Sequence, residues 1–330
     1  MESTILIVGA GQLGSRYLQG LADCQNTLDI YVKDISEQSL KVAKQRWEQL
    51  VHTVAPNTLS GKTKPAAQHK VTFLSSFEKI PKQVDIAIIA TNANVRALLV
   101  KQIVEKYNVR YWILEKVLAQ SESELEDITS LTKNSVGAWV NTSRRMMEWQ
   151  KQICKSLPAG VPLFVRRGGS SWGLACNGIH FLDLVAWWTA ETLTAIDTSE
   201  LDLKWTKSKR KGFFEIRGSI TATFSRGTTL KLESVLDEKP LTFEIEAQGK
   251  IWNIDEKNGV ASGPEGVLIK GKNEMQSTMT SRLVDTLLKE GYCDLAGLIE
   301  SSELHRVFIS SLLKHWNFSH GTNNNQLPIT

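Results

Sequence analysis

The chain has 330 residues, a length that fits two domains of ordinary size or one large domain. Its composition, 42% hydrophobic and 22% charged, is that of a globular protein, and a net charge of +4 is too small to indicate a nucleic-acid-binding surface. No apolar run reaches the roughly 18 residues of a membrane span, and the N-terminus lacks the charged start of a secretory signal. The four cysteines form no C-x-x-C pair and have no metal-ligand spacing. We expect a cytoplasmic protein with reduced thiols and no metal, which binds neither nucleic acid nor membrane.

The first predicted element is an apolar strand that runs directly into a glycine-rich turn. Residues 4–8 precede Gly9-x-Gly11-x-x-Gly14, and an amphipathic helix follows. This strand–turn–helix context is the one that a dinucleotide-binding loop requires. Gly9 permits the tight turn, Gly11 leaves room for a pyrophosphate, and Gly14 allows close packing of helix and strand. We predict that a cofactor binds to Gly9, Gly11, Gln12, Leu13 and Gly14.

Asp34 follows a second predicted strand, residues 28–33, about 20 residues beyond the glycines. An acidic side chain at this place accepts hydrogen bonds from ribose hydroxyls and repels a 2′-phosphate, which favours NAD over NADP. Lys33 beside it weakens that preference. The alternative is that Asp34 caps the next helix, which Ser36 and Glu37 open.

Strands and helices continue to alternate as far as residue 143. We predict strands at 71–74, 84–90, 111–114 and 136–140, and helices near 40–50, 94–107 and 121–131. Residues 56–70 are predicted to form a long polar surface excursion, to which we assign no function. The alternation specifies a doubly wound parallel sheet, in which ligands bind at the carboxyl ends of the strands. Four further cofactor-binding candidates lie at such ends: Thr91, Asn92, Glu115 and Lys116.

Residues 144–330 have a different pattern, which we interpret as an α+β domain for substrate binding and oligomerisation. After helices near 145–156 and 177–188 we expect strands at 201–206, 214–224, 228–236, 241–247 and 250–254, and then helices near 277–290 and 295–314. Together the strands should form a large, open, mainly antiparallel sheet. Because an open sheet leaves one face uncovered, we expect a homodimer or homotetramer.

Three segments resemble one protein family. Glu115-Lys-Val-Leu-Ala119 is similar to the Glu-Lys-Pro-Leu-Ala segment of the glucose–fructose oxidoreductase and inositol dehydrogenase (Gfo/Idh/MocA) family, and residues 90–94 resemble its Ala-Thr-Pro-Asn segment. Residues 174–183 resemble its Leu-x-Asp-x-Gly-x-His-x-x-Asp segment. The resemblance covers essentially the whole chain. It implies hydride transfer between a nicotinamide and a carbinol carbon of a sugar, cyclitol or related compound.

The resemblance also assigns catalytic roles. Lys116 inherits the lysine that approaches both substrate hydroxyl and nicotinamide, and His180 inherits the proton donor or acceptor. Both residue types suit the chemistry, since a cation stabilises a developing alkoxide and histidine titrates near neutral pH. The plain alternatives are a solvated lysine at a strand end and a packed histidine.

Further candidates are weighed in the same way. Trp172 could stack on a sugar face, Asn177 could bind substrate, and Asp183 could either orient the imidazole of His180 or support packing. Arg144 and Arg145 could bind an anion, but we expect them to form salt bridges. The basic run 207–211 is interpreted as a solvated turn.

Two residues depart from the family pattern. Val117 replaces its proline, so we expect a trans peptide bond before it. Cys176, a candidate substrate contact, replaces its aspartate and cannot act as a carboxylate unless it ionises. These departures indicate a divergent subgroup with a different substrate. They also leave open an alternative from another class, a cofactor-binding sensor or regulator without turnover.

Overall fold

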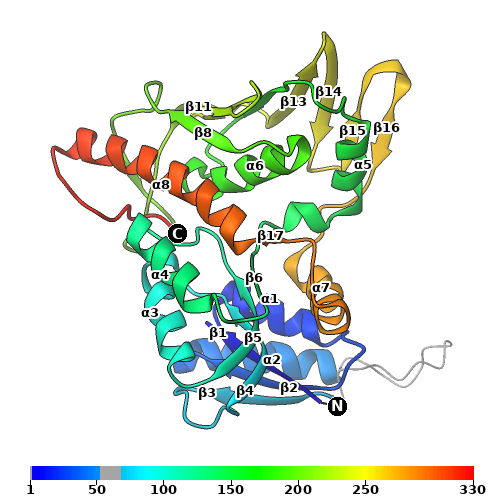
Figure 1. Cartoon of the computed structure of the whole chain (residues 1–330), viewed down its shortest axis with the longest axis vertical. Helices are drawn as coiled ribbons and strands as arrows, with labels where there is room; N and C mark the ends of the chain where they lie inside the picture. The colour runs from blue at the N-terminus through cyan, green and yellow to red at the C-terminus, as the bar shows by residue number, and fades with distance from the viewer. Residues whose placement is uncertain (1, 53–67) are drawn as a thin grey trace. The chain divides into compact units, whose positions relative to one another are not determined.

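The computed structural model describes residues 2–52 and 68–330 (Figure 1). The excursion predicted at 56–70 lies outside these residues, apart from its last three. The chain forms two compact units, each discontinuous in sequence. The first contains Met1–Glu115, Ile128–Asn141 and Glu274–Gly297, and the second contains Lys116–Asp127, Thr142–Asn273 and Leu298–Thr330. Sequence had suggested a single boundary after residue 143.

The first unit is built on a seven-stranded sheet with the order β17-β6-β5-β4-β1-β2-β3. Strands β1 to β6 are mutually parallel, and only β17 pairs antiparallel, with β6. The strands are β1 (Ser3–Val8), β2 (Leu28–Lys33), β3 (Lys70–Leu74), β4 (Gln83–Ile89), β5 (Asn108–Leu114), β6 (Gly137–Val140) and β17 (Ala296–Gly297). The helices are α1 (Gln12–Leu21), α2 (Glu37–His52), α3 (Ala93–Val104), α4 (Glu122–Thr132, whose residues 122–127 belong to the second unit) and α7 (Gln276–Glu290). The predicted doubly wound parallel sheet is confirmed.

Continuous apolar runs explain the centre of this sheet. The side chains of Ile5, Ile7, Ile86 and Ile88 are fully buried, as expected for parallel strands covered on both faces. Helix α7 packs against α1, although more than 250 residues separate their first turns. At the contact, a Cβ on Gly20 would lie 2.6 Å from the carbonyl oxygen of Ser277. The apolar periodicity of α7 predicts a helix but not which unit it joins.

The second unit contains an eight-stranded sheet with the order β16-β15-β14-β13-β7-β12-β11-β8. Only β7 and β12 pair parallel, so the predicted mainly antiparallel sheet is confirmed. Its strands are β7 (Phe164–Gly168), β8 (Leu193–Asp197), β11 (Gly218–Phe224), β12 (Thr229–Ser234), β13 (Thr242–Ala247), β14 (Lys250–Asp255), β15 (Val260–Ser262) and β16 (Leu268–Lys270). A separate hairpin pairs β9 (Thr206–Lys207) with β10 (Phe214–Glu215). The helices are α5 (Glu148–Ser156), α6 (Leu174–Thr189) and α8 (Leu298–His320), with 3-10 turns at Ser143–Met146 and Pro264–Gly266.

Helix α6 lies between this sheet and α8. A Cβ on Gly178 would contact Phe308 of α8 on one side and Leu232 of β12 on the other, at 3.3 and 3.5 Å. Trp188 stacks on Phe243 of β13 with ring centroids 5.9 Å apart. The helix is therefore buried almost all round, which fits its high content of apolar residues.

Two strand predictions were wrong in detail. Residues 201–205 do not form a strand, and Thr206 belongs to β9. Leu201 and Trp205 are buried while Leu203 is exposed, whereas a strand would place all three on one face. The predicted strand 214–224 is divided into β10 (Phe214–Glu215) and β11, which begins at Gly218. The φ of Gly218 is +101°, and a Cβ there would lie 2.4 Å from the carbonyl oxygen of Glu200. Among the described residues no helix is both long and apolar enough to cross a bilayer.

Candidate functional site

The three glycines of the loop in the first unit differ in what a side chain would meet. Gly9 has a φ of +97°, and a Cβ there would lie 2.9 Å from the carbonyl oxygen of Ala90. At Gly14 a Cβ would fall 1.7 Å from the carbonyl oxygen of Gly9, so only glycine lets α1 begin this close to the turn. At Gly11 a Cβ would meet nothing within 4 Å. The first two glycines thus serve the fold, while the space at Gly11 is open for a ligand.

The start of α1 adds the polar part of this site. Gly11 is the N-cap, no side chain caps the helix, and Gln12 and Leu13 form its first turn. Unpaired amides and the positive end of the helix dipole at such a terminus favour phosphate groups. The loop residues predicted from sequence therefore lie together.

Asp34 is bound to the chain through both carboxylate oxygens. Oδ2 accepts from the amide of Ala10, inside the glycine loop, at 2.6 Å, and Oδ1 accepts from the amide of Ser36 at 2.8 Å. The cap of α2 is Ser36, whose hydroxyl accepts from the amide of Ser39. Each carboxylate oxygen has a further lone pair for a ribose hydroxyl. Lys33, by contrast, is buried with its amine 4.7 Å from the ring centroid of Phe77, and burial lowers its pKa.

The other predicted cofactor residues of this unit differ in surroundings. The hydroxyl of Thr91 is buried and has no hydrogen-bond partner among the described residues, whereas Asn92 is exposed at the start of α3. Glu115 is buried, and its Oε1 accepts from the hydroxyl of Tyr17 at 2.5 Å and from the amide of Asn141 at 2.6 Å. Burial and the Glu115 charge raise the pKa of Tyr17 well above its usual value. The Glu115 side chain thus ties α1 to the sheet, and its cofactor role stays a prediction.

The second unit holds a cavity of about 420 Å³ beside the start of α6. Predicted site residues Lys116, Trp172, Cys176 and Asn177 all line it. The remaining lining residues are Ser171, Gly173, Thr206, Lys207, Ser208, Lys209, Arg210, Glu215, Ile216, Arg217, Ser234 and Thr330. Its volume is in the range of small-ligand sites. The structure therefore brings one lysine and three substrate candidates into one cavity.

Lys116 is oriented by α6. Its Nζ donates to the carbonyl oxygen of Cys176 at 3.0 Å and to Oδ1 of Asn177 at 3.2 Å. Asn177 is fixed in turn, since its amide donates to the carbonyl oxygen of Trp172 at 2.9 Å. The ammonium is thus held in one place at the cavity wall, as a group that stabilises a developing oxyanion must be.

The peptide bond between Lys116 and Val117 is cis, so the expectation of a trans bond was wrong. That expectation used the intrinsic preference of a non-proline residue. In the fold, Val117 is fully buried and Lys116 is held by α6, so the surroundings and not the intrinsic preference determine the isomer. The cis bond that the family's proline would favour is present without a proline.

Glu215 is a cavity residue that sequence reasoning missed. Its Oε2 accepts from the amide of Ala175 at 2.9 Å, and its carboxylate also interacts with the thiol and amide of Cys176. Burial raises its pKa, while these hydrogen bonds and Lys116 oppose that change. The available sequence signal was weak: Glu215 and Arg217, two residues apart, share one face of a predicted strand.

Cys176 cannot replace the family's aspartate as a proton acceptor. Burial, and next the charge of Glu215, raise its pKa to about 12. The thiol is therefore protonated at neutral pH, as the sequence argument required. A carboxylate does stand beside it, but that carboxylate comes from Glu215 on β10 rather than from α6.

His180 lies one turn after Cys176 on α6 but does not line the cavity. Its Nδ1 is buried and has no hydrogen-bond partner among the described residues. Burial, followed by the positive charges of Lys116 and Arg144 and by His305, lowers its pKa well below the usual value. The imidazole is therefore neutral at physiological pH.

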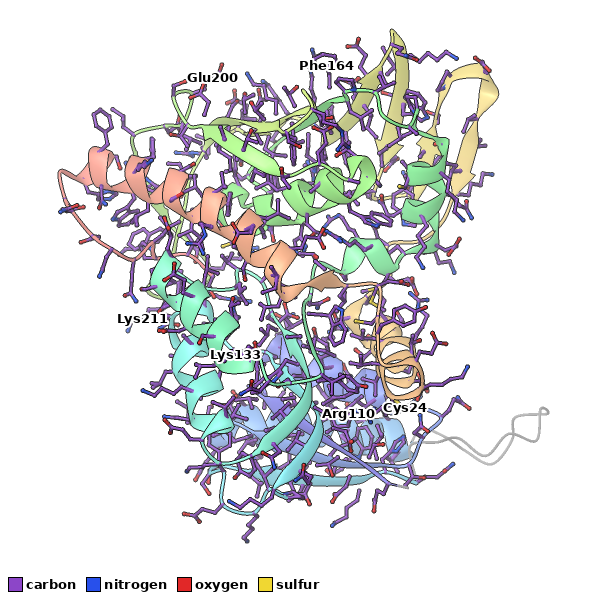
Figure 2. The ribbon with its side chains drawn as sticks, in the orientation of Figure 1. Cys24, Arg110, Lys133, Phe164, Glu200 and Lys211 are labelled. Carbon is purple, nitrogen blue, oxygen red and sulfur yellow. The ribbon has the colours of Figure 1, made fainter. Side chains whose placement is uncertain are left out.

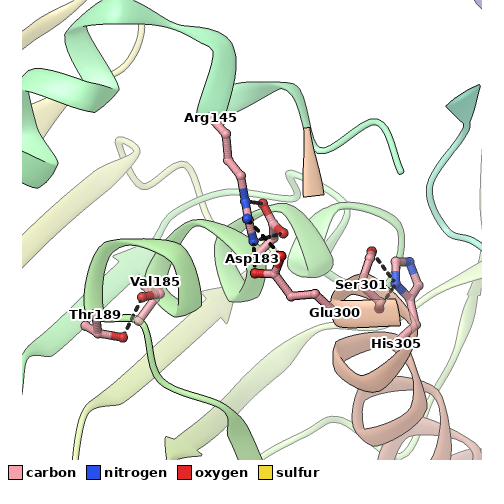
Figure 3. A network of polar contacts seen from close by, with 7 residues as sticks. All are labelled: Arg145, Asp183, Val185, Thr189, Glu300, Ser301 and His305. Atoms are coloured by element: carbon pink, nitrogen blue, oxygen red, sulfur yellow. Dashed lines mark hydrogen bonds and ion pairs between the residues drawn. The ribbon is translucent and has the colours of Figure 1, made fainter. Parts of the chain in front are cut away.

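Asp183 does not face the cavity. Its two carboxylate oxygens accept from Arg145, at 2.9 Å from Nε and 2.7 Å from the second guanidinium nitrogen (Figure 3). Arg145 also donates to Glu300 at 2.6 Å, so the salt bridges expected of this arginine are present. Arg144 likewise pairs with Glu256 at 2.8 Å. Asp183 thus anchors α6, and in the part of the chain that the structure describes Nδ1 of His180 has no hydrogen bond to it.

Trp172 is held at the cavity wall. Its indole nitrogen donates to the carbonyl oxygen of Glu233 at 2.7 Å, and its ring meets that of Phe181 edge-on. The guanidinium of Arg167 lies 4.9 Å from the indole centroid. The remaining part of the ring is what the cavity can offer to a ligand.

The fold is shared with solved oxidoreductases. No protein-family model matches the sequence, and no curated protein matches it significantly. UDP-N-acetylglucosamine 3-dehydrogenase from Acidithiobacillus ferrooxidans aligns with a TM-score of 0.67 at 12% identity over 94% of this chain and 96% of its own. An oxidoreductase from Agrobacterium radiobacter, in complex with NAD+, L-tartaric acid and magnesium, gives 0.68 at 14% identity, covering 96% and 97%. Myo-inositol dehydrogenase from Lactobacillus casei, in complex with NAD(H) and myo-inositol, gives 0.62 at 10% identity, covering 98% and 96%. The chain therefore has the two-part fold of these oxidoreductases, as its resemblance to the Gfo/Idh/MocA family implied.

Proposed function

We propose that this protein is an NAD-dependent dehydrogenase that transfers hydride between nicotinamide and a carbinol carbon of a sugar, a cyclitol or a sugar derivative. The observation that carries the proposal is the position of Lys116. It is the second residue after β5, a strand of the sheet that carries the glycine loop, and its amine lines the cavity. Proteins of the same fold are described as dehydrogenases of an amino-sugar nucleotide and of myo-inositol.

The residues of the first unit fit a dinucleotide. The open space at Gly11 and the uncapped start of α1 would take its pyrophosphate, Asp34 its ribose, and the unpartnered Thr91 hydroxyl a further polar group. NAD supplies the hydride acceptor when it is bound. Because Asp34 is anionic and Lys33 is packed on Phe77, we expect NAD to bind more tightly than NADP.

In the cavity, Lys116 stabilises the alkoxide that forms as the substrate hydroxyl loses its proton. Its contacts with Cys176 and Asn177 hold the ammonium in position before substrate arrives. His180, kept neutral by its surroundings, is the proton acceptor that the family resemblance implies, and it holds the proton only transiently, because its lowered pKa disfavours the imidazolium.

We also propose a homodimer or homotetramer located in the cytoplasm. Alternate residues along β7 and β14 expose Phe164 and Ile251 on the sheet face away from α6, and apolar groups on a sheet face suit a contact with a second copy (Figure 2 labels Phe164). All four cysteines are free thiols, as a reducing compartment would keep them. Light scattering on the purified protein measures the assembly.

The experiment is a screen of NAD+ reduction by nicotinamide absorbance against neutral, phosphorylated and oxidised sugars and cyclitols, with Lys116→Met as the control. We expect at least one compound to be oxidised by the wild type and to lose most of that rate in the variant. Tight NAD binding without turnover of any compound would favour the alternative, a sensor that retains the fold. Neither NAD binding nor turnover would contradict both.

A further inference from the structure

The hairpin of β9 and β10 contributes an unusual wall to the cavity. We propose that the substrate carries an anionic group, a phosphate or a carboxylate, which Lys207, Lys209 and Arg210 bind. This inference rests on the proposed function, because it names the class of substrate for the same cavity. Sequence had suggested only a solvated turn at residues 207–211.

The charge of the cavity wall is the first reason. Five basic residues line it, against one acidic residue, Glu215; the basic residues are Lys116, Lys207, Lys209, Arg210 and Arg217. Glu215 is engaged by the first amides of α6 and by the Cys176 thiol, so its negative charge is already compensated within the protein. A neutral sugar would leave the cations of the hairpin, Lys207, Lys209 and Arg210, without a negatively charged counterpart.

Missing ion pairs are the second reason. Basic residues close by have acidic partners: Arg217 lies 3.6 Å from Asp202, and Lys231 lies 2.6 Å from Glu200. Lys207, Lys209 and Arg210 form no ion pair with any residue in the described ranges, 2–52 and 68–330. Three unpaired cations on one short turn at a cavity create a local field that attracts anions.

The turn itself is built into the fold, which is the third reason. The amide of Ser208 donates to the carbonyl oxygen of Phe213 at 2.9 Å, and the Ser208 hydroxyl and the backbone of Arg210 are hydrogen-bonded to each other. Phe213 is buried, and Phe214 packs edge-on against Trp316 of α8 with ring centroids 5.0 Å apart. The backbone that carries the three cations is therefore anchored in the core.

The residues around Lys116 and the residues of the hairpin are suited to different parts of the ligand. Lys116, Asn177 and Trp172 offer one ammonium, one amide and one aromatic edge, which suit hydroxyl groups and a sugar ring. The guanidinium of Arg210 binds phosphate or carboxylate oxygens as a fork, and the two lysines act as point charges. We therefore assign the carbinol to the Lys116 wall and the anionic group to the hairpin.

The test is calorimetric titration with glucose, glucose 6-phosphate, UDP-glucose and glucuronate, with and without saturating NADH so that no probe occupies the cofactor loop. The proteins are the wild type, Lys207→Gln/Arg210→Gln, and a matched control, Lys204→Gln/Lys211→Gln. The control removes the same charge from neighbouring residues that do not line the cavity (Lys211 is labelled in Figure 2). We expect at least one anionic probe to bind about ten-fold or more tighter than glucose, since a charged hydrogen bond contributes that much.

The double variant should lose this preference and the control should keep it, with affinity falling as salt rises. The probe that binds identifies the source of the charge: a sugar phosphate, a nucleotide sugar or a sugar acid. The proposal is overturned if no anionic probe binds more tightly than glucose, or if the control loses as much affinity as the double variant. Anion binding without turnover of any compound would contradict the dehydrogenase and leave the anionic site intact. Turnover of neutral sugars without an anion preference would support the dehydrogenase and contradict the anionic site.

Discussion

The glycine loop and the cavity beside α6 are two functional regions built in opposite ways. The loop is formed by one short segment, Gly9 to Gly14, and most of its properties belong to the backbone: space at Gly11 and uncapped amides at the start of α1. The cavity gathers side chains from four distant segments, residues 116, 171–177, 206–217 and 234, together with Thr330. A site made of backbone groups tolerates changes in its side chains. In a site made of side chains from several segments, a chemical group can instead come from a different segment. The carboxylate from Glu215 beside Cys176 is such an exchange.

The largest effect on stability is expected at the Asp183–Arg145 ion pair, which anchors α6 but does not line the cavity. Asp183→Ala leaves the Arg145 guanidinium buried without its bidentate partner, and we expect a loss of about 3–5 kcal/mol in the free energy of unfolding. Glu300→Gln, at a side chain that is 50% exposed, should cost less than about 1 kcal/mol. Denaturant titration measures both. Equal costs would show that the buried pair does not hold α6.

The second prediction concerns Gly14, a glycine of the loop that the fold requires, in contrast to Gly11, where a Cβ would meet open space. Gly14→Ala places a methyl group 1.7 Å from the carbonyl oxygen of Gly9, so α1 must shift, at a cost of about 1–3 kcal/mol. The control is Gly297→Ala in β17, where a Cβ meets nothing within 4 Å. Thermal unfolding of the two variants should differ clearly, and similar melting temperatures would contradict the steric argument.

A third effect concerns pH. The pKa of His180 is lowered in the fold, so the unfolded chain takes up a proton below about pH 6.5 that the folded chain does not. Folding stability should therefore fall as the pH is lowered through this window, by at most about 1.4 kcal/mol per pH unit. His180→Asn should show a shallower loss than the wild type. Parallel stability profiles would mean that the imidazole is not kept neutral.

The smallest effect tests the exchanged carboxylate. With a pKa of about 12, Cys176 should be alkylated slowly by iodoacetamide at neutral pH and faster as the pH rises. Glu215→Gln removes the second cause of that raised pKa but leaves the burial, so the rate should increase by less than about ten-fold. Cys293, whose pKa is also raised to about 12, should not respond. An unchanged alkylation rate at Cys176 in the Glu215→Gln variant would contradict the claim that Glu215 helps to raise the pKa of this thiol.

The loop was predictable from sequence because its physics is local. The steric reasons for Gly9 and Gly14 lie within a few residues or at the adjacent strand end, the space at Gly11 belongs to the same turn, and Asp34 lies at the next strand end. The cavity was predictable only in part. Lys116, Trp172, Cys176 and Asn177 lie on segments that resemble a known family, but Glu215 and the three cations of the hairpin reach the cavity by long-range folding.

The errors have the same origin. The strand predicted at 214–224 is divided just before Gly218, which passes close to the backbone of Glu200, a contact that periodicity does not contain. The Lys116–Val117 bond is cis although neither residue favours it. Asp183, one helical turn from His180 in sequence, points instead to Arg145. In each case a tertiary contact overrides a local preference.

The central claim, that the loop holds the cofactor while the Lys116 cavity performs the proton chemistry, is tested most directly by two variants and two measurements. Gly11→Ala adds a methyl group where the protein leaves open space, so it should keep its melting temperature but weaken NAD binding in calorimetry. Lys116→Met should bind NAD as the wild type does and lose about 10²–10⁴-fold in kcat on the substrate found by the screen. The opposite pattern, or the same loss of NAD affinity in both variants, would contradict this division of roles.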